Sequence, residues 1–281
     1  MSRAARIVPS LLVGAIVSGC YQPTVARQRG YHSSDADLSV TRIVHGSAII
    51  DFRETRIVLD PWYSPSPPLG QSETIGISVE NLPPLRGFLI THQHEDHFDP
   101  GMLAEYPDKS VRIVARRGLG ERLREIGYGD VVELEDWEQS QIGGAIVTAV
   151  PASHRVPENG YVLQANSLTV YVAGDTMFDR SRFQDIVARF PAIDLALLPV
   201  GGTRVLGRRL DMTPEQAALA CKILKPAHVI PYHYGLTGPV LFVTTASQPA
   251  QSFAQAIEKS ELTPRPEVVI LDPGESWHHY R

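Results

Sequence analysis

The sequence predicts an α/β fold in which two β-sheets pack face to face and helices cover the outside. Short apolar runs, many of them β-branched, recur along the chain and indicate strands. Longer helical segments occur between them without strict alternation, which disfavours one doubly wound parallel sheet. About 240 residues remain after an N-terminal leader and tether, enough for one sizeable core and too few for two comfortable domains.

Strands are predicted over residues 41–50 and 55–60, joined by a turn at 51–54. Further strands are expected near Gly87, Val111, Val131, Ala145, Tyr161, Leu168, Asp194, His228 and Val268. The expected helices are 117–126, 181–189, 214–224 and 249–259. The third has the clearest start, because Thr213 can cap it, Pro214 suits its first position and Gln216 completes a capping box.

The first forty residues predict export and a lipid anchor. Arg3 and Arg6 precede the apolar stretch 7–17, which is too short for a membrane-spanning helix of about twenty residues. Small residues then lead to Cys20, as in the lipobox of bacterial lipoproteins, whose cysteine is diacylated. The alternative is an ordinary signal peptide with an incidental cysteine. We therefore expect a signal peptide at 1–19, a lipidated Cys20 with a polar tether at 20–40, and a single folded domain at 41–281.

This anchor predicts attachment to the membrane of a bacterial cell envelope. If the organism has two membranes, Tyr21 rather than Asp after the cysteine favours the outer membrane, facing the periplasm. A formal net charge of −5 disfavours a nucleic-acid partner. Cys221 is the only other cysteine, and its position on an apolar helical stripe predicts a core residue. The sequence does not indicate an oligomeric state.

The segment from Thr91 to His97, directly after the apolar run 87–90, predicts a metal site. It places three imidazoles and a carboxylate on one loop at a strand end, and such a group would lack partners without cations. Three later candidate ligands, His154, Asp175 and His233, also follow predicted strands. Because side chains at neighbouring strand ends meet at one edge, all these groups are expected to converge.

With its His-x-His-x-Asp-His motif followed by a distant His, Asp and His, the chain resembles the metallo-β-lactamase superfamily. The resemblance implies a four-layer αββα sandwich and two divalent cations. It implies that one cation is held by His92, His94 and His154, the other by Asp96, His97 and His233, and that Asp175 bridges them. Zinc and manganese suit these ligands, and iron is compatible with them.

Several further phrases resemble one branch of that superfamily, the bacterial metal-dependent hydrolases related to ascorbate-6-phosphate lactonase and, more distantly, to the phospholipase D that cleaves N-acyl-phosphatidylethanolamine. The resemblance extends from about Thr41 to the C-terminus. The phrases are His45-Gly46-Ser47, Ile57-Val58-Leu59-Asp60-Pro61-Trp62, Ala173-Gly174-Asp175-Thr176, the segment from Met212 to Ala217, and the segment from Val229 to Gly235.

The predicted reaction is hydrolysis, because two cations can activate a water molecule and stabilise the charge that develops on the attacked oxygen. Asp96, one of the expected metal ligands, is also predicted to be a catalytic residue. A leaving-group acid is sought among His45, Tyr232 and Tyr234, with a buried structural role as the alternative for His45. Asp60 is expected to orient a ligand histidine.

Two long loops, 62–84 and 235–249, are candidates for controlling substrate access. Phe242 in the second could contact a lipid or acyl group, or could simply pack on its own domain. Arg204 and Arg208 could bind a substrate phosphate, with solvated surface charges as the alternative.

Three classes of function follow. The first is an envelope hydrolase acting on a small-molecule or lipid substrate through a phosphodiester, a phospholipid headgroup or a lactone. The second is hydrolysis of an amide or thioester, including breakdown of signal lactones or antibiotics. The third is a non-enzymatic surface lipoprotein that keeps its metals for folding or binding.

Overall fold

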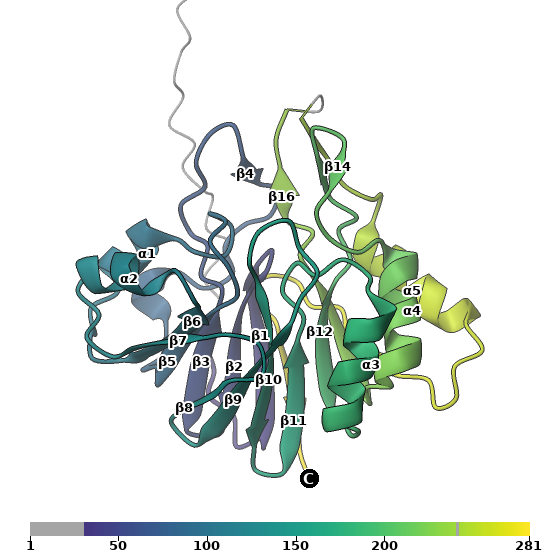
Figure 1. Ribbon diagram of the computed structural model, residues 1–281, viewed down its shortest axis with the longest axis horizontal. Helices are drawn as coiled ribbons and strands as arrows, with labels where there is room; N and C mark the ends of the chain where they lie inside the picture. The colour runs from purple at the N-terminus through teal and green to yellow at the C-terminus, as the bar shows by residue number, and fades with distance from the viewer. Residues whose placement is uncertain (1–30, 240–241) are drawn as a thin grey trace, which may run out of the picture.

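Two seven-stranded mixed sheets form the centre of the protein (Figure 1). The computed structural model describes residues 31–239 and 242–281. The predicted signal peptide and the lipidation site Cys20 lie outside this part of the chain. Among the described residues, no helix has the length and apolar character needed to cross a membrane.

The first sheet comes mainly from the N-terminal half of the chain. Its parallel part, β3-β5-β6-β7, carries the first histidine motif at the carboxyl end of β5. In spatial order its strands are β19 (Ser276–His279), β1 (Leu38–Val44), β2 (Ser47–Phe52), β3 (Thr55–Leu59), β5 (Gly87–Ile90), β6 (Arg112–Arg116) and β7 (Val131–Leu134).

The second sheet comes from the C-terminal half. Strands β11, β12 and β15 run parallel, so their carboxyl ends lie at one edge. In spatial order its strands are β18 (Glu267–Val268), β15 (His228–Tyr232), β12 (Leu195–Pro199), β11 (Leu168–Val172), β10 (Asn159–Ala165), β9 (Ala145–Pro151) and β8 (Gln139–Ile142).

Helices cover the outer face of each sheet. Figure 1 shows α1 (Pro100–Glu105) and α2 (Gly120–Glu125) beside the first sheet, and α3 (Arg180–Arg189), α4 (Pro214–Leu224) and α5 (Pro249–Lys259) beside the second. One apolar cluster lies between the sheets and one lies under each group of helices. The predicted four-layer αββα sandwich is therefore confirmed.

The predicted strand 41–50 is wrong in one respect. A tight turn at His45 and Gly46 splits it into β1 and β2, and His45 adopts a left-handed conformation with φ of 48°. Fully buried residues on both sides of the turn hide it in the sequence, because no change in polarity marks it. The turn brings His45 to the edge where the metal-binding motifs lie.

The described part of the predicted tether is part of the domain. Strand β1 begins at Leu38, and Ala36 before it is buried. Tyr31 donates a hydrogen bond to the carboxylate of Asp51. The folded domain thus begins earlier than the expected boundary at residue 41.

Two small sheets lie above the edge that carries the motifs (Figure 1). One pairs β4 (Gly70–Gln71) with β16 (Leu236–Thr237), so the two predicted access loops contact each other directly. The other joins β13 (Arg204–Val205), β14 (Arg208–Arg209) and β17 (Val243–Thr244).

Candidate metal centre

The predicted ligands come from the carboxyl ends of strands in both sheets. The motif that contains His92 and Asp96 follows β5, whereas His154, Asp175 and His233 follow β9, β11 and β15. The sandwich brings these ends together at one edge, and all seven candidate ligands meet there in two clusters of possible metal-binding atoms.

The first cluster contains His92, His94, His154 and Asp175, with one potential ligand atom of each within 4.8 Å of the others. Nδ1 of His94 lies 2.9 Å from Nε2 of His92 and 3.3 Å from Nε2 of His154. His94 therefore presents Nδ1 to the centre, and the other two histidines present Nε2.

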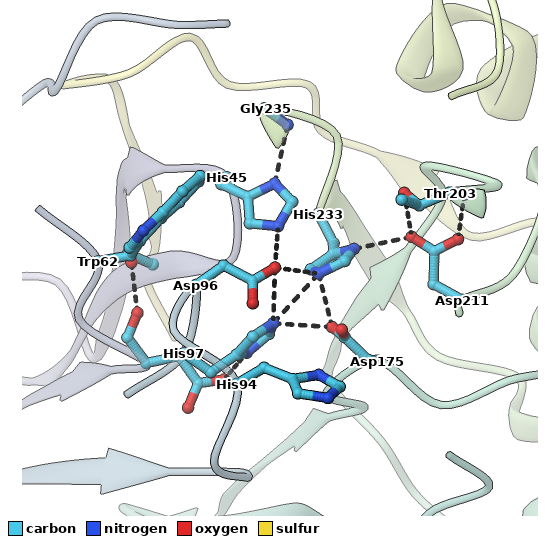
Figure 2. Close-up of polar contacts among 12 residues, drawn as sticks. His45, Trp62, His94, Asp96, His97, Asp175, Thr203, Asp211, His233 and Gly235 are labelled. Carbon is cyan, nitrogen blue, oxygen red and sulfur yellow. Dashed lines mark hydrogen bonds and ion pairs between the residues drawn. The ribbon is translucent and has the colours of Figure 1, made fainter. Parts of the chain in front are cut away.

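The second cluster contains His45, Asp96, His97 and His233 (Figure 2). Nε2 of His97 and Nε2 of His233 face each other at 3.1 Å. Oδ2 of Asp96 lies 3.8 Å from the former and 3.6 Å from the latter.

Asp175, a member of the first cluster, also contacts the second cluster. Its Oδ1 lies 2.7 Å from Nε2 of His233 and 3.0 Å from Nε2 of His97, on the side of the second cluster. Its Oδ2 faces the first cluster, 3.8 Å from Nε2 of His92. One carboxylate therefore presents a different oxygen to each histidine group, as a bridging ligand would.

Hydrogen bonds on the far side of His97, His233 and His154 direct the lone pair of each imidazole towards the centre. Nδ1 of His97 lies 2.8 Å from a carboxylate oxygen of Asp60, and Nδ1 of His233 lies 2.7 Å from one of Asp211. Nδ1 of His154 lies 3.0 Å from the carbonyl oxygen of Leu210. These acceptors hold the proton on Nδ1 and leave Nε2 free to bind a cation.

The residues present fit two divalent cations. Nε2 of His97 and Nε2 of His233 lie 3.1 Å apart, and because Nδ1 of each imidazole donates to an aspartate, the neutral tautomers have no proton between these two atoms. Oδ1 of Asp175 is buried between Nε2 of His97 and Nε2 of His233, and it has no hydrogen-bond donor when neither of these nitrogens carries a proton. Cations would satisfy all of these atoms, and the mixed nitrogen and oxygen donors suit zinc, manganese or iron.

His45 belongs to the second cluster by position, but its tautomer excludes it as a ligand. Its Nδ1 accepts a hydrogen bond of 2.9 Å from the backbone N–H of Gly235 (Figure 2). A neutral His45 must then carry its proton on Nε2, which lies 3.2 Å from Oδ2 of Asp96. His45 therefore donates to a candidate ligand, and burial together with His233 lowers its pKa to about 3.

Asp60 orients the metal-binding loop. One carboxylate oxygen accepts the backbone N–H of Thr91 at 2.8 Å, and the other accepts both the Thr91 hydroxyl and Nδ1 of His97. Asp60 is fully buried and contacts His97 from outside the centre. This is the placement expected of a residue that orients a ligand.

Sequence reasoning missed two buried acids. Glu158 accepts the N–H of Asp175 at 2.6 Å and lies 3.2 Å from Nδ1 of His92, so it supports the shared carboxylate and a histidine together. Burial raises its pKa to about 8. Asp211 supports His233 and is itself held by the N–H and hydroxyl of Thr203. Each lies next to a strand or turn, but neither belongs to a pattern that marks it.

The two tyrosines considered as acids have other contacts. The hydroxyl of Tyr232 is buried and donates to the carbonyl of Gly174 at 2.8 Å, the residue before Asp175. The Arg42 guanidinium lies over the ring of Tyr234, 4.3 Å from its centre. Burial raises the pKa of both phenols. Tyr232 thus fixes the turn that carries Asp175.

In the absence of cations, the histidines and carboxylates of the centre shift one another's pKa values. Burial opposes protonation of His97 and His233, but Asp175 and the other carboxylates prevail and raise the pKa of both well above its usual value. Burial likewise opposes ionisation of Asp96 and Asp175, but the imidazoles prevail and lower their pKa well below the usual range. Protons therefore compete with cations for these histidines.

A cavity of about 770 Å³ opens over the centre. His94, Asp96, Asp175 and His233 form its floor. Arg208 lines it, whereas Arg204 is not among its lining residues and donates instead to the carbonyl of Gly207 in its own hairpin. Phe242 is 49% exposed and is also not among the lining residues, although its carbonyl accepts the N–H of Leu206 at the rim.

Comparison with known proteins agrees with this geometry. The model of the Beta-lactamase superfamily domain matches residues 55–234. A UPF0173 metal-dependent hydrolase of Pyrococcus furiosus is 30% identical over 250 residues, which cover 85% of this chain and 98% of that protein. A UPF0173 metal-dependent hydrolase of Koribacter versatilis is 30% identical over 257 residues, which cover 85% of this chain and 97% of that protein. The solved structure of Igni18, a metallo hydrolase from Ignicoccus hospitalis, has a TM-score of 0.68 at 23% identity, and the match covers 85% of this chain and 97% of that one.

The fold and the two clusters of histidines and aspartates thus define a protein of the metallo-β-lactamase superfamily. Within it, the chain belongs to the UPF0173 family of metal-dependent hydrolases.

Proposed function

We propose that the protein hydrolyses an ester-like bond, in a phosphodiester, a phospholipid headgroup or a lactone, with the help of two divalent cations. The observation that carries this proposal is Asp175, which presents one oxygen to each histidine cluster on the floor of an accessible cavity. When bound, two cations would supply an activated water molecule and would stabilise negative charge on the attacked oxygen.

The chain's own residues hold this site in place. Asp60, Glu158 and Asp211 lie behind His97, His92 and His233 respectively, so each of these imidazoles has an acidic partner that fixes its orientation. Such fixed orientation removes the need to reorganise the ligands during the reaction.

Asp96 is the best placed group for moving a proton. It lines the cavity, and its Oδ2 accepts the Nε2–H of buried His45. A proton taken up by Asp96 could be delivered to a leaving oxygen in the cavity, while His45 holds the carboxylate in position. His45 is not among the residues that line the cavity, so it acts through Asp96.

The sequence phrases that resemble ascorbate-6-phosphate lactonase and, more distantly, the N-acyl-phosphatidylethanolamine phospholipase D favour a lactone or a phosphodiester as the target bond. The metals alone do not choose between them, because both bonds present an oxygen that a cation can polarise.

Turnover by residues 21–281 loaded with zinc or manganese tests the proposal. The substrates are bis(p-nitrophenyl) phosphate and a simple γ-lactone, and the control variant is D175A. We expect turnover of at least one substrate and a loss in D175A that exceeds the 10- to 100-fold, roughly, associated with loss of a residue that only orients a ligand. No turnover of either substrate by protein with two bound metals would overturn the proposal and favour amide or thioester substrates or a non-enzymatic role.

We also propose that the enzyme works in the bacterial envelope, anchored through Cys20. The small residues before Cys20 support this location. Cell fractionation of the full chain and a C20S variant tests it. The full chain should sediment with membranes and C20S should not, whereas equal sedimentation of both would contradict the anchor.

A further inference from the structure

The cavity over the metal centre has a polar floor and an apolar wall. Its wall is formed by leucine and valine side chains from three separate segments: the loop before β4, strand β16, and the hairpin β13–β14 with the residue after it. These residues are Leu69, Val205, Leu206, Leu210 and Leu236. Two of them, Leu69 and Val205, pack on the cluster of Trp62, Leu236 and Val243, which gives the wall a buried apolar support.

Leu206 is the most informative part of this wall. It occupies the tip of the hairpin with φ of 49°, followed by Gly207 with φ of 74°. Such two-residue turns favour Asn-Gly or Asp-Gly, because a leucine is strained at positive φ. Leu206 is nevertheless present and is 66% exposed, so it stabilises neither the turn nor the core. Its placement at the cavity suggests that its apolar surface serves a ligand.

Cationic side chains lie beside this wall. Arg155 and Arg208 both line the cavity, and Nε of Arg155 donates to the carbonyl of Arg209 at 2.9 Å, which fixes it against the hairpin. Glu95 is the acidic lining residue that does not belong to either metal-binding cluster. Apart from the metal-binding clusters, the cavity lining therefore carries two guanidinium groups and one carboxylate, that of Glu95. Bound divalent cations would add further positive charge.

We propose that the cavity selects an anionic substrate with an apolar chain, specifically a phosphodiester in which one alcohol carries an alkyl or acyl chain. The phosphate would lie over the metal centre within reach of Arg208, and the chain would lie along Leu69, Leu206 and Leu236. This inference deepens the proposed hydrolysis and rests on it. A soluble alkyl phosphodiester and a membrane phospholipid share this chemistry.

Binding tests the inference independently of turnover. Calorimetric titration of the zinc-loaded protein uses ethyl, butyl, hexyl and octyl phosphate, which are the monoester products of such substrates, each below its micelle concentration. If each methylene is fully buried, affinity should rise by up to about fourfold per carbon until the wall is covered. Equal affinity for all four chain lengths would overturn the inference.

Two variants with matched controls locate the effect. L206S should weaken binding of octyl phosphate more than binding of ethyl phosphate, whereas L219S removes another exposed leucine, 48% exposed on α4, and should leave the chain-length dependence unchanged. R208Q should weaken all four ligands by a similar factor, and R265Q, on an exposed arginine that does not line the cavity, should not. Identical behaviour of each variant and its control would contradict the assigned contacts.

A parallel activity series separates this inference from the proposed function. Methyl, butyl and octyl p-nitrophenyl phosphate should be hydrolysed with kcat/KM that rises with chain length. Turnover without chain-length dependence would overturn the inference and leave the hydrolase proposal intact. No turnover of any diester, with chain-dependent binding retained, would overturn phosphodiester hydrolysis alone.

A comparison of soluble and membrane-bound substrates decides where the substrate with its alkyl or acyl chain comes from. Preference for a phosphodiester monomer in solution over the same headgroup in phosphatidylcholine vesicles would assign a soluble substrate. The opposite preference, lost in L206S, would assign a membrane lipid. Failure to act on or bind either form would overturn the inference.

Discussion

The backbone N–H of Gly235 donates to Nδ1 of His45 at 2.9 Å, and this bond decides which nitrogen of His45 carries the proton. This hydrogen bond links the two large sheets, because His45 lies in the turn between β1 and β2 of the first sheet and Gly235 follows β15 of the second. Position alone would place His45 among the metal ligands, but the Gly235 contact makes it a donor to Asp96.

Replacing His45 with alanine should therefore preserve two bound cations per chain and weaken the binding of one of them by about 10- to 100-fold, because Asp96 loses its orienting partner. Metal content by mass spectrometry and affinity by chelator competition check this. The comparison is H233A, which removes an imidazole whose Nε2 points into the centre. If H45A and H233A lose metal to the same extent, His45 is a ligand.

Replacing Asp211 with alanine should weaken metal binding by a similar factor, about 10- to 100-fold, because His233 loses the acceptor that fixes its proton. The change also leaves the buried N–H of Thr203 without its acceptor, at a cost of about 1–3 kcal/mol in the free energy of unfolding. D211N retains a carbonyl acceptor and should therefore lose less metal affinity and less free energy of unfolding than D211A. Chelator competition and denaturant unfolding measure the two effects, and D211N matching D211A would argue against this role.

Replacing Tyr232 with phenylalanine distinguishes an acid from a support. The hydroxyl donates to the carbonyl of Gly174, so its loss should lower the free energy of unfolding by about 0.5–1.5 kcal/mol and slow turnover by less than about tenfold. If turnover instead slows by roughly 100-fold or more, which is the scale of general acid catalysis, Tyr232 is restored as the leaving-group acid. Denaturant unfolding and the pH profile of the turnover rate provide the two readouts.

The stability of the metal-free protein should fall as the pH rises above about 6.5, the value at which unfolded histidines titrate. The pKa values of His97 and His233 are raised in the fold, so their contribution is fully present below an unfolded value of about 6.5 and is lost as the pH increases through their folded values. Bound cations replace those protons, so the loaded protein should not share the loss. The difference in Tm between loaded and metal-free protein, measured at several pH values from about 6.5 upwards, should therefore widen as the pH rises. A constant difference would contradict this.

The sequence was sufficient for features that depend on local pattern. The capping box of Thr213 and Gln216 fixed the start of α4, and its predicted bounds, together with those of α5, are confirmed. The motif from His92 to His97 indicated a metal site because its residue types have few other uses at that spacing. Helix α1 was missed although Asp99 and Pro100 form a suitable start, because only six residues follow that signal.

Features that depend on contacts between distant segments were not predictable in the same way. The turn at His45 lies within an apolar run, so only the paired strands show it. Glu158 and Asp211 are single acids whose partners lie on other elements, 17 residues away at Asp175 and 22 residues away at His233. The pairing of β4 with β16 joins loops that have no common pattern.

The metal-binding groups come from both halves of the sandwich, the motif after β5 from one sheet and His154, Asp175 and His233 from the other. Bound cations would therefore act as cross-links that close long loops of the chain, a role that disulfides often fill in exported proteins. Such cross-links oppose separation of the two sheets, which is the opening that would expose the largest apolar surface to proteases. The supply of metal in the cell would then determine how long each molecule survives as well as whether it is active.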